Sequence, residues 1–364
     1  MSSARNSIGG LETAMLTAAA VFAAGVFIAP RLLVADAGRA AGLALVLVSL
    51  LVIAWTWEMA RRATRVEGRD LPRALLRRGG WAGRAWLMLV ALVETALAGQ
   101  VLTTYAAMAA AVVLPGSSRL EIVVLIAAAA YTAARHRIEG LARAVFVAFL
   151  AAALMALLAF ALLLARGEQL ATVWPGPHLA AVPILNGAFD GLLLYGGSTA
   201  IVAFLPAHKS KGVPGVVSGT VLAFVLIAVA FAGTLATGGP NFVLTQVWPV
   251  VSALRTLVLA SFVLNRFGLI VVLAWSAFAL TFAAVHIWVA TEYTCLAAGS
   301  DRWRGLVAFA ATALAVLVTT RLPSLAAFEG FARGVVVPAV FAVFIIWLVL
   351  AFVLTWRRPR QAES

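Results

Sequence analysis

The stretch Ala23-Ala-Gly-Val-Phe-Ile-Ala-Pro30 interrupts the first long apolar segment of the chain. Gly25 removes side-chain bulk near the middle of that segment, and Pro30 removes a backbone hydrogen-bond donor a few residues later. A second interruption, Tyr195-Gly-Gly-Ser-Thr199, lies near the middle of a later apolar segment and is followed by Pro206. These two weak points predict helices that lose their regular backbone bonding inside an apolar environment.

The composition identifies that environment as a lipid bilayer. Of the 364 residues, 64% are hydrophobic and only 11% are charged, whereas a soluble domain is about half apolar and about a quarter charged. Long apolar runs recur along the chain, and a spanning helix needs roughly 20 mostly apolar residues. We expect an all-α integral membrane protein of about ten transmembrane helices, in a single domain covering residues 1–364. The expected helices cover about 11–34, 40–60, 84–113, 120–134, 141–165, 183–207, 214–237, 267–297, 304–321 and 334–356.

The net charge of +13 comes from basic residues that cluster between the apolar runs. If the N-terminus lies inside, 19 of the 27 Lys and Arg residues fall on the cytoplasmic side. The positive-inside rule then predicts a bacterial inner membrane protein, of the cell or the spore, with both termini in the cytoplasm. The charge is explained by topology and by attraction to anionic lipid headgroups, so no nucleic-acid partner is expected. The apolar connection 238–266 suggests a helical hairpin at the outer face or, alternatively, an eleventh span.

Ten helices divide into two halves of five, at about 11–165 and 183–356, and the two interruptions fall in the first helix of each half. In many transporters, two halves of inverted topology enclose a site near the membrane midplane, formed by interrupted helices. Free backbone groups at that depth must face protein, water or ligand rather than lipid. We therefore expect a binding site for a small polar molecule, although close helix packing is the alternative explanation for such glycines. Its candidate residues at the breaks are Gly25, Tyr195, Gly196, Gly197 and Ser198.

Polar residues within other predicted spans extend the candidate site. An ionisable group in a span suggests function, so Glu94 is expected to bind a substrate amine or carry a proton, unless it is a protonated or paired structural residue. Gln100 is a second candidate on the same helix, with an interhelical hydrogen bond as the alternative. Ser276 could offer its oxygen to a ligand, although hydroxyls in spans more often bond to their own backbone. His286 is expected to be structural or to line a cavity.

The sequence contains no phosphate loop, nucleotide fingerprint, metal-ligand spacing or nucleophile elbow. We therefore expect no enzyme activity, no cofactor and no metal site. The single cysteine, Cys295, cannot form an internal disulfide, and no redox role is expected.

Several motifs carry a family resemblance. The stretch Val26-Phe-Ile-Ala-Pro30 is similar to the first helix of amino acid–polyamine–organocation permeases. Three other groups of motifs are more specific, and their order along nearly the whole chain resembles the permease-like B subunit of bacterial spore nutrient germinant receptors. They are Arg137-Ile-Glu-Gly-Leu-Ala-Arg143; Asp190-Gly-Leu-Leu-Leu-Tyr-Gly-Gly197 running to Leu205-Pro206; and Val247-Trp-Pro249, Leu254-Arg255 and Asn265-Arg-Phe-Gly-Leu-Ile270 with Trp275.

The resemblance implies a five-plus-five fold of the leucine-transporter type. It also implies that the chain senses a nutrient, often an amino acid, beside A-type and C-type receptor subunits, and so triggers germination. Gly25 and Phe27 then lie at the break of the first helix, and Tyr195, Gly196 and Gly197 at that of the sixth. Relatives often carry Glu after the glycine where this chain has Gly197-Ser198, which leaves the charge of the ligand open. A proton- or sodium-coupled amino acid transporter, and a structural subunit with a vestigial pocket, are the alternatives.

Overall fold

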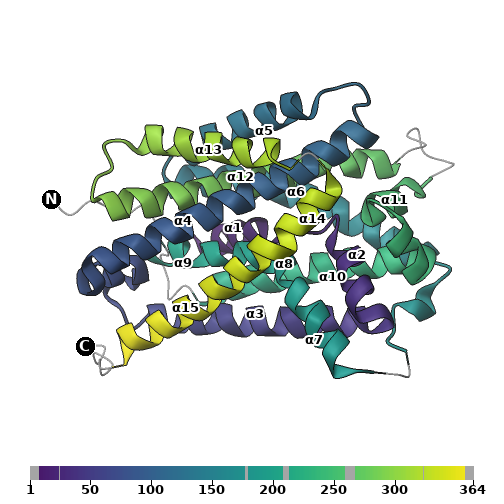
Figure 1. Cartoon of the computed structure of the whole chain (residues 1–364), viewed down its shortest axis with the longest axis horizontal. Coiled ribbons are helices and arrows are strands. Elements are labelled where there is room, and N and C mark those ends of the chain that lie inside the picture. Colours follow the sequence, from purple (N-terminus) through teal and green to yellow (C-terminus); the bar gives the residue numbers. More distant parts are fainter. Residues whose placement is uncertain are drawn as a thin grey trace.

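The computed structural model describes residues 8–23, 25–176, 179–207, 213–258, 267–322 and 324–356. Helices build the architecture of these residues, and most of them run side by side along the long axis of the molecule (Figure 1). The α-helices are α1 (Gly10–Phe22), α2 (Ala29–Ala37), α3 (Ala41–Ala63), α4 (Leu71–Val112), α5 (Arg119–Ala134), α6 (Ile138–Arg166), α7 (Ala181–Asp190), α8 (Leu192–Tyr195), α9 (Ile201–Phe204), α10 (Val213–Thr245), α11 (Pro249–Arg255), α12 (Phe267–Ala298), α13 (Arg304–Thr320), α14 (Leu325–Phe331) and α15 (Val337–Thr355). Short 3-10 or π turns connect several of them: η1 (Gly38–Ala40), η2 (Glu67–Arg69), η3 (Leu170–Thr172), η4 (Gly196–Ala200), η5 (Leu205–Ala207) and η6 (Ala332–Val336).

Among the described residues, seven helical segments are long and apolar enough to cross a membrane. These segments are Ala29–Ala63, Leu71–Val112, Ile138–Arg166, Ala181–Ala207, Val213–Thr245, Ile270–Ala298 and Ala326–Thr355. Two shorter apolar helices, α1 and α13, accompany them. The prediction of an all-helical multi-pass membrane protein is confirmed, and each of the ten predicted segments contains helix. The number of crossings and the residue limits of the two halves remain predictions.

The first predicted helix is divided into α1 and α2. The carbonyl of Gly25 accepts hydrogen bonds from the amides of Ile28 (3.0 Å) and Ala29 (2.7 Å), which closes a tight turn between the two pieces. Pro30 lies in the first turn of α2, where an amide has no intrahelical partner and its absence costs nothing. The sequence predicts that Pro30 weakens the first helix. In the structure it begins the second piece instead.

The sixth predicted helix is irregular without being unwound. It consists of α7, α8, the 3-10 turn η4, α9 and the 3-10 turn η5, so the backbone stays helical through Tyr195-Gly-Gly-Ser-Thr199 but changes its pitch. The hydroxyl of Thr199 donates to the carbonyl of Gly196 at 2.8 Å and satisfies one acceptor of this tighter turn. The structure thus differs from the expectation of free backbone groups in this helix.

Two long helices also differ in extent from the predicted spans. α4 begins at Leu71 and includes the basic segment of the preceding loop, with a kink at Gly80 (φ 50°). α10 continues to Thr245 past a kink at Gly239 (φ 72°), where only glycine is free of backbone strain. Of the predicted connection 238–266, the part up to Thr245 belongs to α10 and Pro249–Arg255 form α11, while residues 259–266 lie outside the described residues. The choice between a hairpin and an eleventh span stays a prediction.

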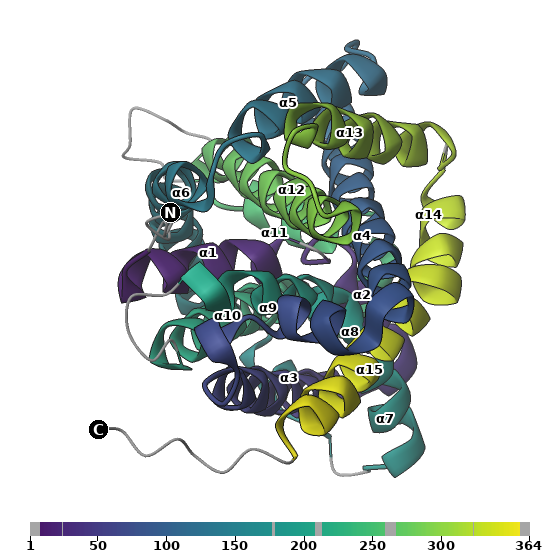
Figure 2. The same cartoon turned by 90° about the vertical axis from the view of Figure 1, so that its left-hand side faces the viewer.

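The centre of the bundle is built around α1. It packs against α6, α10 and α12 and against the 3-10 turn η4, while α4 packs along α12. In the end-on view of Figure 2, α1, α8 and α9 lie in the middle of the molecule, and α5 and α13 lie on one side of them, with α3 and α15 on the other. α1, α8 and η4 therefore lie in the interior of the bundle, whereas α7, at the start of the sixth predicted helix, exposes Val182 and Leu185.

Candidate functional site

The broken end of α1 meets η4 at the carbonyl of Ala20. A side-chain carbon on Gly197 would lie 1.6 Å from the Ala20 oxygen and 2.7 Å from its carbonyl carbon. Only a glycine allows two backbones to approach so closely. Gly197 is thus a packing residue between α1 and η4, and any movement of one segment is transmitted to the other.

Gly25 and Gly196 make similar, less crowded contacts. A side-chain carbon on Gly25 would lie 3.3 Å from the backbone of Leu193 in α8, so the turn between α1 and α2 also packs against the sixth helix. One on Gly196 would lie 3.0 Å from Leu97 of α4 and 3.2 Å from Val340 of α15. In this conformation, these glycines therefore allow close packing of neighbouring helices, which was the alternative explanation for them.

Aromatic side chains fill the space beside the break of the first helix. The ring of Trp275 on α12 lies 4.9 Å from Phe27 and 5.6 Å from Phe22, measured between ring centroids. Phe278 lies 4.7 Å from Phe22 and 5.2 Å from Trp275. Phe27 is only 3% exposed. This aromatic cluster, defined as Phe22, Phe27, Trp275 and Phe278, seals the break from solvent.

Three polar atoms around the break have no hydrogen-bond partner among the described residues. They are Ser198 Oγ on η4, Trp275 Nε1 on α12 and Glu94 Oε1 on α4, and all three side chains are fully buried. A buried polar group without a partner costs about 1–3 kcal/mol. Such atoms mark places where a guest molecule or water can supply the missing hydrogen bond.

The second oxygen of Glu94 is paired with a histidine from the facing helix. Oε2 of Glu94 lies 2.5 Å from Nδ1 of His286, and both side chains are 0% exposed. The other ring nitrogen of His286 lies 3.0 Å from the carbonyl oxygen of Ala20. His286 therefore joins α12 to α4 and also to the end of α1, whose last carbonyls have no intrahelical partner. Glu94 is thus paired in this conformation, and its expected roles in binding a substrate amine or carrying a proton stay predictions.

The remaining candidates lie at separate places. The hydroxyl of Tyr195 is 2.5 Å from Ser49 Oγ of α3, on the side of η4 away from the aromatic cluster. Ser276 donates to the carbonyl of Leu273 at 2.7 Å and also interacts with Tyr105 of α4. Gln100 is fully buried on α4, six residues beyond Glu94. The structure thus gathers Gly25, Phe27, Glu94, Gly197 and Ser198 around the end of α1, and leaves Tyr195, Gln100 and Ser276 at neighbouring helix contacts.

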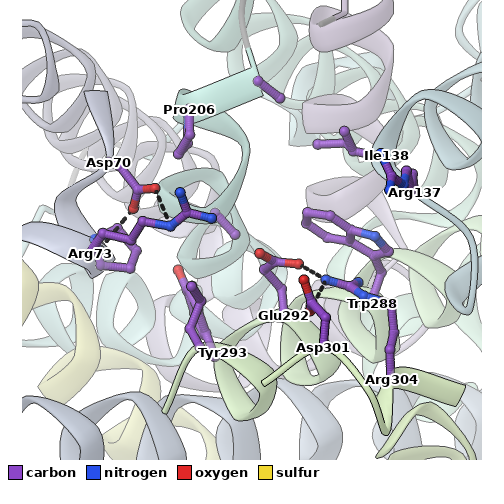
Figure 3. A pocket seen from close by; sticks show the side chains of 14 residues that line it. Asp70, Arg73, Arg137, Ile138, Pro206, Trp288, Glu292, Tyr293, Asp301 and Arg304 are labelled. Carbon is purple, nitrogen blue, oxygen red and sulfur yellow. Dashed lines mark hydrogen bonds and ion pairs between the residues drawn. The ribbon is translucent and has the colours of Figure 1, made fainter. Parts of the chain in front are cut away.

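A cavity of about 480 Å³ opens at the end of the bundle that the charge distribution predicts to be cytoplasmic. We call it the inner vestibule. Asp70, Arg73, Glu292, Tyr293 and Arg304 contribute to its wall together with apolar residues of α9 and α12 (Figure 3). Arg73 Nε pairs with Asp70 at 3.2 Å, and Arg304 pairs with Glu292 and, at 3.3 Å, with Asp301.

The opposite end is closed by ion pairs, which we call the outer ion-pair cluster. Arg333 of η6 binds Asp36 of α2 at 2.9 Å and Asp190 of α7 at 2.6 Å. Arg31 of α2 binds Glu329 of α14 at 3.3 Å. These bonds hold both interrupted segments to α14 and η6. The described ion pairs thus tie the helices together at this end, and the inner vestibule lies at the other.

Sequence reasoning missed Ala20, Trp275 and Tyr293 as participants, and it named His286 only as a structural or cavity-lining residue. The Ala20 carbonyl carries no side-chain signal, and Trp275 was noted only as part of a motif. His286 and Tyr293 are seven residues apart and so share one face of α12, and this spacing of two polar groups in an apolar span was the signal that could have found them. Among the described residues, no group of three or more His, Cys, Asp or Glu side chains is placed to hold a metal ion.

Comparisons with known proteins agree with this architecture. The chain is similar in structure to MhsT, solved in complex with L-phenylalanine, with a TM-score of 0.65 and 13% identity over 96% of this chain and 92% of MhsT. It is also similar to a Na⁺-coupled sialic acid symporter in a substrate-bound outward-open state, with a TM-score of 0.64 and 13% identity over 94% of this chain and 79% of the symporter. These likenesses establish the leucine-transporter-type fold.

A search of the curated proteins returned no match. The family model described as "Spore germination protein" matches residues 8–295, which is most of the chain. Family and fold are those of permeases and transporters rather than of enzymes. The chain therefore belongs to the spore germination protein family, as a transporter-like protein of the membrane.

Proposed function

We propose that this chain is the nutrient-sensing subunit of a spore germinant receptor, and that an amino acid binds beside the break between α1 and α2. In this proposal, it works with A-type and C-type subunits in the spore inner membrane, with both termini in the cytoplasm. Membership of the spore germination protein family supports the setting. The structural likeness to a protein that was solved with L-phenylalanine supports the class of ligand.

The observation that carries the proposal is the set of unpartnered polar atoms around the broken helix. Ser198 Oγ, Trp275 Nε1 and Glu94 Oε1 belong to three different elements, and each is buried without a hydrogen bond among the described residues. An amino acid offers both an ammonium donor and carboxylate acceptors. Trp275 and His286, the partner of Glu94, are eleven residues and about 16 Å apart along α12, so one molecule can satisfy the atoms at one end of this stretch, and water the rest. The apolar surroundings supplied by Phe22 and Phe27 suit a small apolar side chain.

Binding at this place requires the aromatic cluster to open. The ligand would favour the arrangement in which the break is accessible, and would shift a pre-existing equilibrium of the bundle by its preference for that arrangement. Gly197 transmits the change, because α1 and η4 are in backbone contact there. Partner subunits that contact the bundle would then detect the new arrangement without any covalent step.

The test is binding of L-amino acids to the purified full-length chain, measured by the shift in its thermal unfolding. Trp275→Phe and Ser198→Ala each remove one unpartnered atom, and a hydrogen bond to a charged ligand group contributes about 1.5–3 kcal/mol. Since 1.4 kcal/mol is about a factor of ten, each variant should weaken binding at least about tenfold. Trp303→Phe, at an exposed tryptophan, is the matched control. The proposal fails if no L-amino acid shifts unfolding, or if both variants bind as tightly as the unmodified chain.

A coupled transporter is the second candidate, because Glu94 and His286 place ionisable groups within predicted spans. Uptake of labelled amino acid into liposomes that contain only this chain separates the two functions. Accumulation driven by a proton or sodium gradient supports transport, whereas binding without accumulation supports sensing. A structural subunit with a vestigial pocket predicts neither.

A further inference from the structure

The pairing of Glu94 with His286 fixes the positions of the exchangeable protons. The carbonyl oxygen of Ala20 can only accept a hydrogen bond, so Nε2 of His286 must carry a hydrogen to make the 3.0 Å contact. Nδ1 then faces Oε2 of Glu94 at 2.5 Å. That contact requires one further proton, held either as imidazolium beside carboxylate or as neutral imidazole beside neutral carboxyl. Without this proton, a lone pair on Nδ1 would face a lone pair on Oε2 in a fully buried site, and the pair of residues would carry a net negative charge.

No fixed positive charge replaces that proton. Within the described part of the chain, neither residue has an Arg or Lys partner. The imidazole is covered by the ring of Phe282, whose centroid lies 4.0 Å from its own, and α1 and η4 contribute the Ala20 carbonyl and Gly197. An unpaired buried charge is strongly disfavoured in such surroundings. Loss of the shared proton therefore has to be accompanied by separation of the pair or by access of water.

Tyr293 connects the pair to the inner vestibule. It lies two turns beyond His286 on the same face of α12. Its hydroxyl has no hydrogen-bond partner among the described residues, although the residue contributes to the vestibule wall (Figure 3). Asp70, at the start of α4, and Glu292 of α12 are titratable groups of the same wall. Tyr293 is thus the polar residue that α12 places between the vestibule and the buried pair.

We propose that Glu94 and His286 form a proton-binding site, that the proton reaches it from the inner vestibule past Tyr293, and that the loaded site holds the end of α1 in place. The loaded imidazole donates to the Ala20 carbonyl at the end of α1, where the helix dipole favours a donor or a positive charge. Release of the proton to water in the vestibule breaks the contact between Nδ1 and Oε2 and frees α1 from α12. This site shares Glu94 with the proposed ligand site, but it does not depend on which function is correct, since a sensor and a transporter can both use it.

The test is infrared difference spectroscopy of the full-length chain in liposomes as the pH is changed from mildly acidic to mildly alkaline. The unmodified chain should give carboxyl and imidazole bands that disappear in both Glu94→Gln and His286→Gln. Glu168→Gln and His136→Gln, at exposed positions, are the matched controls and should keep these bands. Bands that survive unchanged in Glu94→Gln overturn the proposal.

A second measurement reports on the vestibule wall at α9 and on the route. Ala203→Cys in a Cys295→Ala background places one thiol on the vestibule wall. The labelling rate of this thiol should change several-fold with pH, and the change should vanish when Glu94→Gln is added. If the rate still changes with pH in that variant, protonation of the pair does not control the conformation of the bundle. If the pair variants do not fold, Tyr293→Phe replaces them, because it removes only an unpartnered hydroxyl. The infrared response to a rapid pH change should then slow several-fold, and a response as fast as that of the unmodified chain overturns the route.

Discussion

Replacing Gly197 by alanine should separate α1 from η4. Of the glycine-to-alanine changes around the end of α1, this one should destabilise the protein most. The new carbon would lie 1.6 Å from the Ala20 oxygen, and ordinary contact begins at 3.4 Å, so the two backbones must separate by about 1.8 Å. Overpacking of this kind costs about 1–3 kcal/mol or more. The same movement stretches the 3.0 Å bond between His286 and Ala20 beyond hydrogen-bonding distance, which adds about 1 kcal/mol.

The assay is thermal unfolding of the purified variant in detergent, compared with Gly140→Ala on the exposed start of α6. A side-chain carbon at Gly140 would meet only His136, at an ordinary 3.6 Å, so this control adds the same methyl group without crowding. Gly197→Ala should lower the apparent Tm by several degrees and Gly140→Ala should not. If both variants unfold at the temperature of the unmodified chain, the contact between α1 and η4 is not as close as described and the reasoning is wrong.

Three further substitutions test other parts of the bundle. Phe27→Ala removes a ring that packs on Trp275 and should lower the free energy of unfolding by about 3–5 kcal/mol. Denaturant unfolding measures this loss. A loss below about 1 kcal/mol would show that the aromatic cluster is not tightly packed. Tyr195→Phe removes the bond to Ser49 and should cost about 0.5–1.5 kcal/mol, with Tyr131→Phe on α5 as the control that stays neutral. Arg333→Gln leaves two carboxylates without their cation and should raise hydrogen exchange in α2 and α7 but not in α13; equal exchange in all three helices argues against closure by this residue.

Much of the fold followed from simple physical patterns. Apolar runs of spanning length locate the helices, because unpaired backbone groups are not tolerated in lipid. The break at Gly25 followed from the loss of side-chain bulk, but the role of Pro30 did not, since proline in a first turn starts a helix as readily as proline in the middle ends one. The kinks at Gly80 and Gly239 depend on tertiary packing, which local propensity does not encode.

The candidate site was predicted in part. Glu94 was a candidate because an ionisable group in a predicted span suggests a function. Its partner His286 could be identified only from the structure, which places α4 and α12 side by side. Gly196 and Gly197 were recognised, but a glycine that admits a ligand and one that admits a neighbouring backbone look the same in sequence. The role of Trp275 depends on which face of α12 points inward, and the apolar residues of this helix give no periodicity from which to read it. Only the spacing of Tyr293 from His286 marks a shared face.

The closure of the outer end by partly exposed charges has a consequence for the protein's surroundings. Arg333 and Arg31 keep 41% and 29% of their side chains accessible, so dissolved ions can reach them. These pairs span 2.6–3.3 Å, which is shorter than the screening length of about 8 Å at 0.15 M salt, and that length falls to about 3 Å only near 1 M. Ordinary salt should therefore leave α2 and α7 tied to α14 and η6. Only salt near 1 M should weaken these contacts.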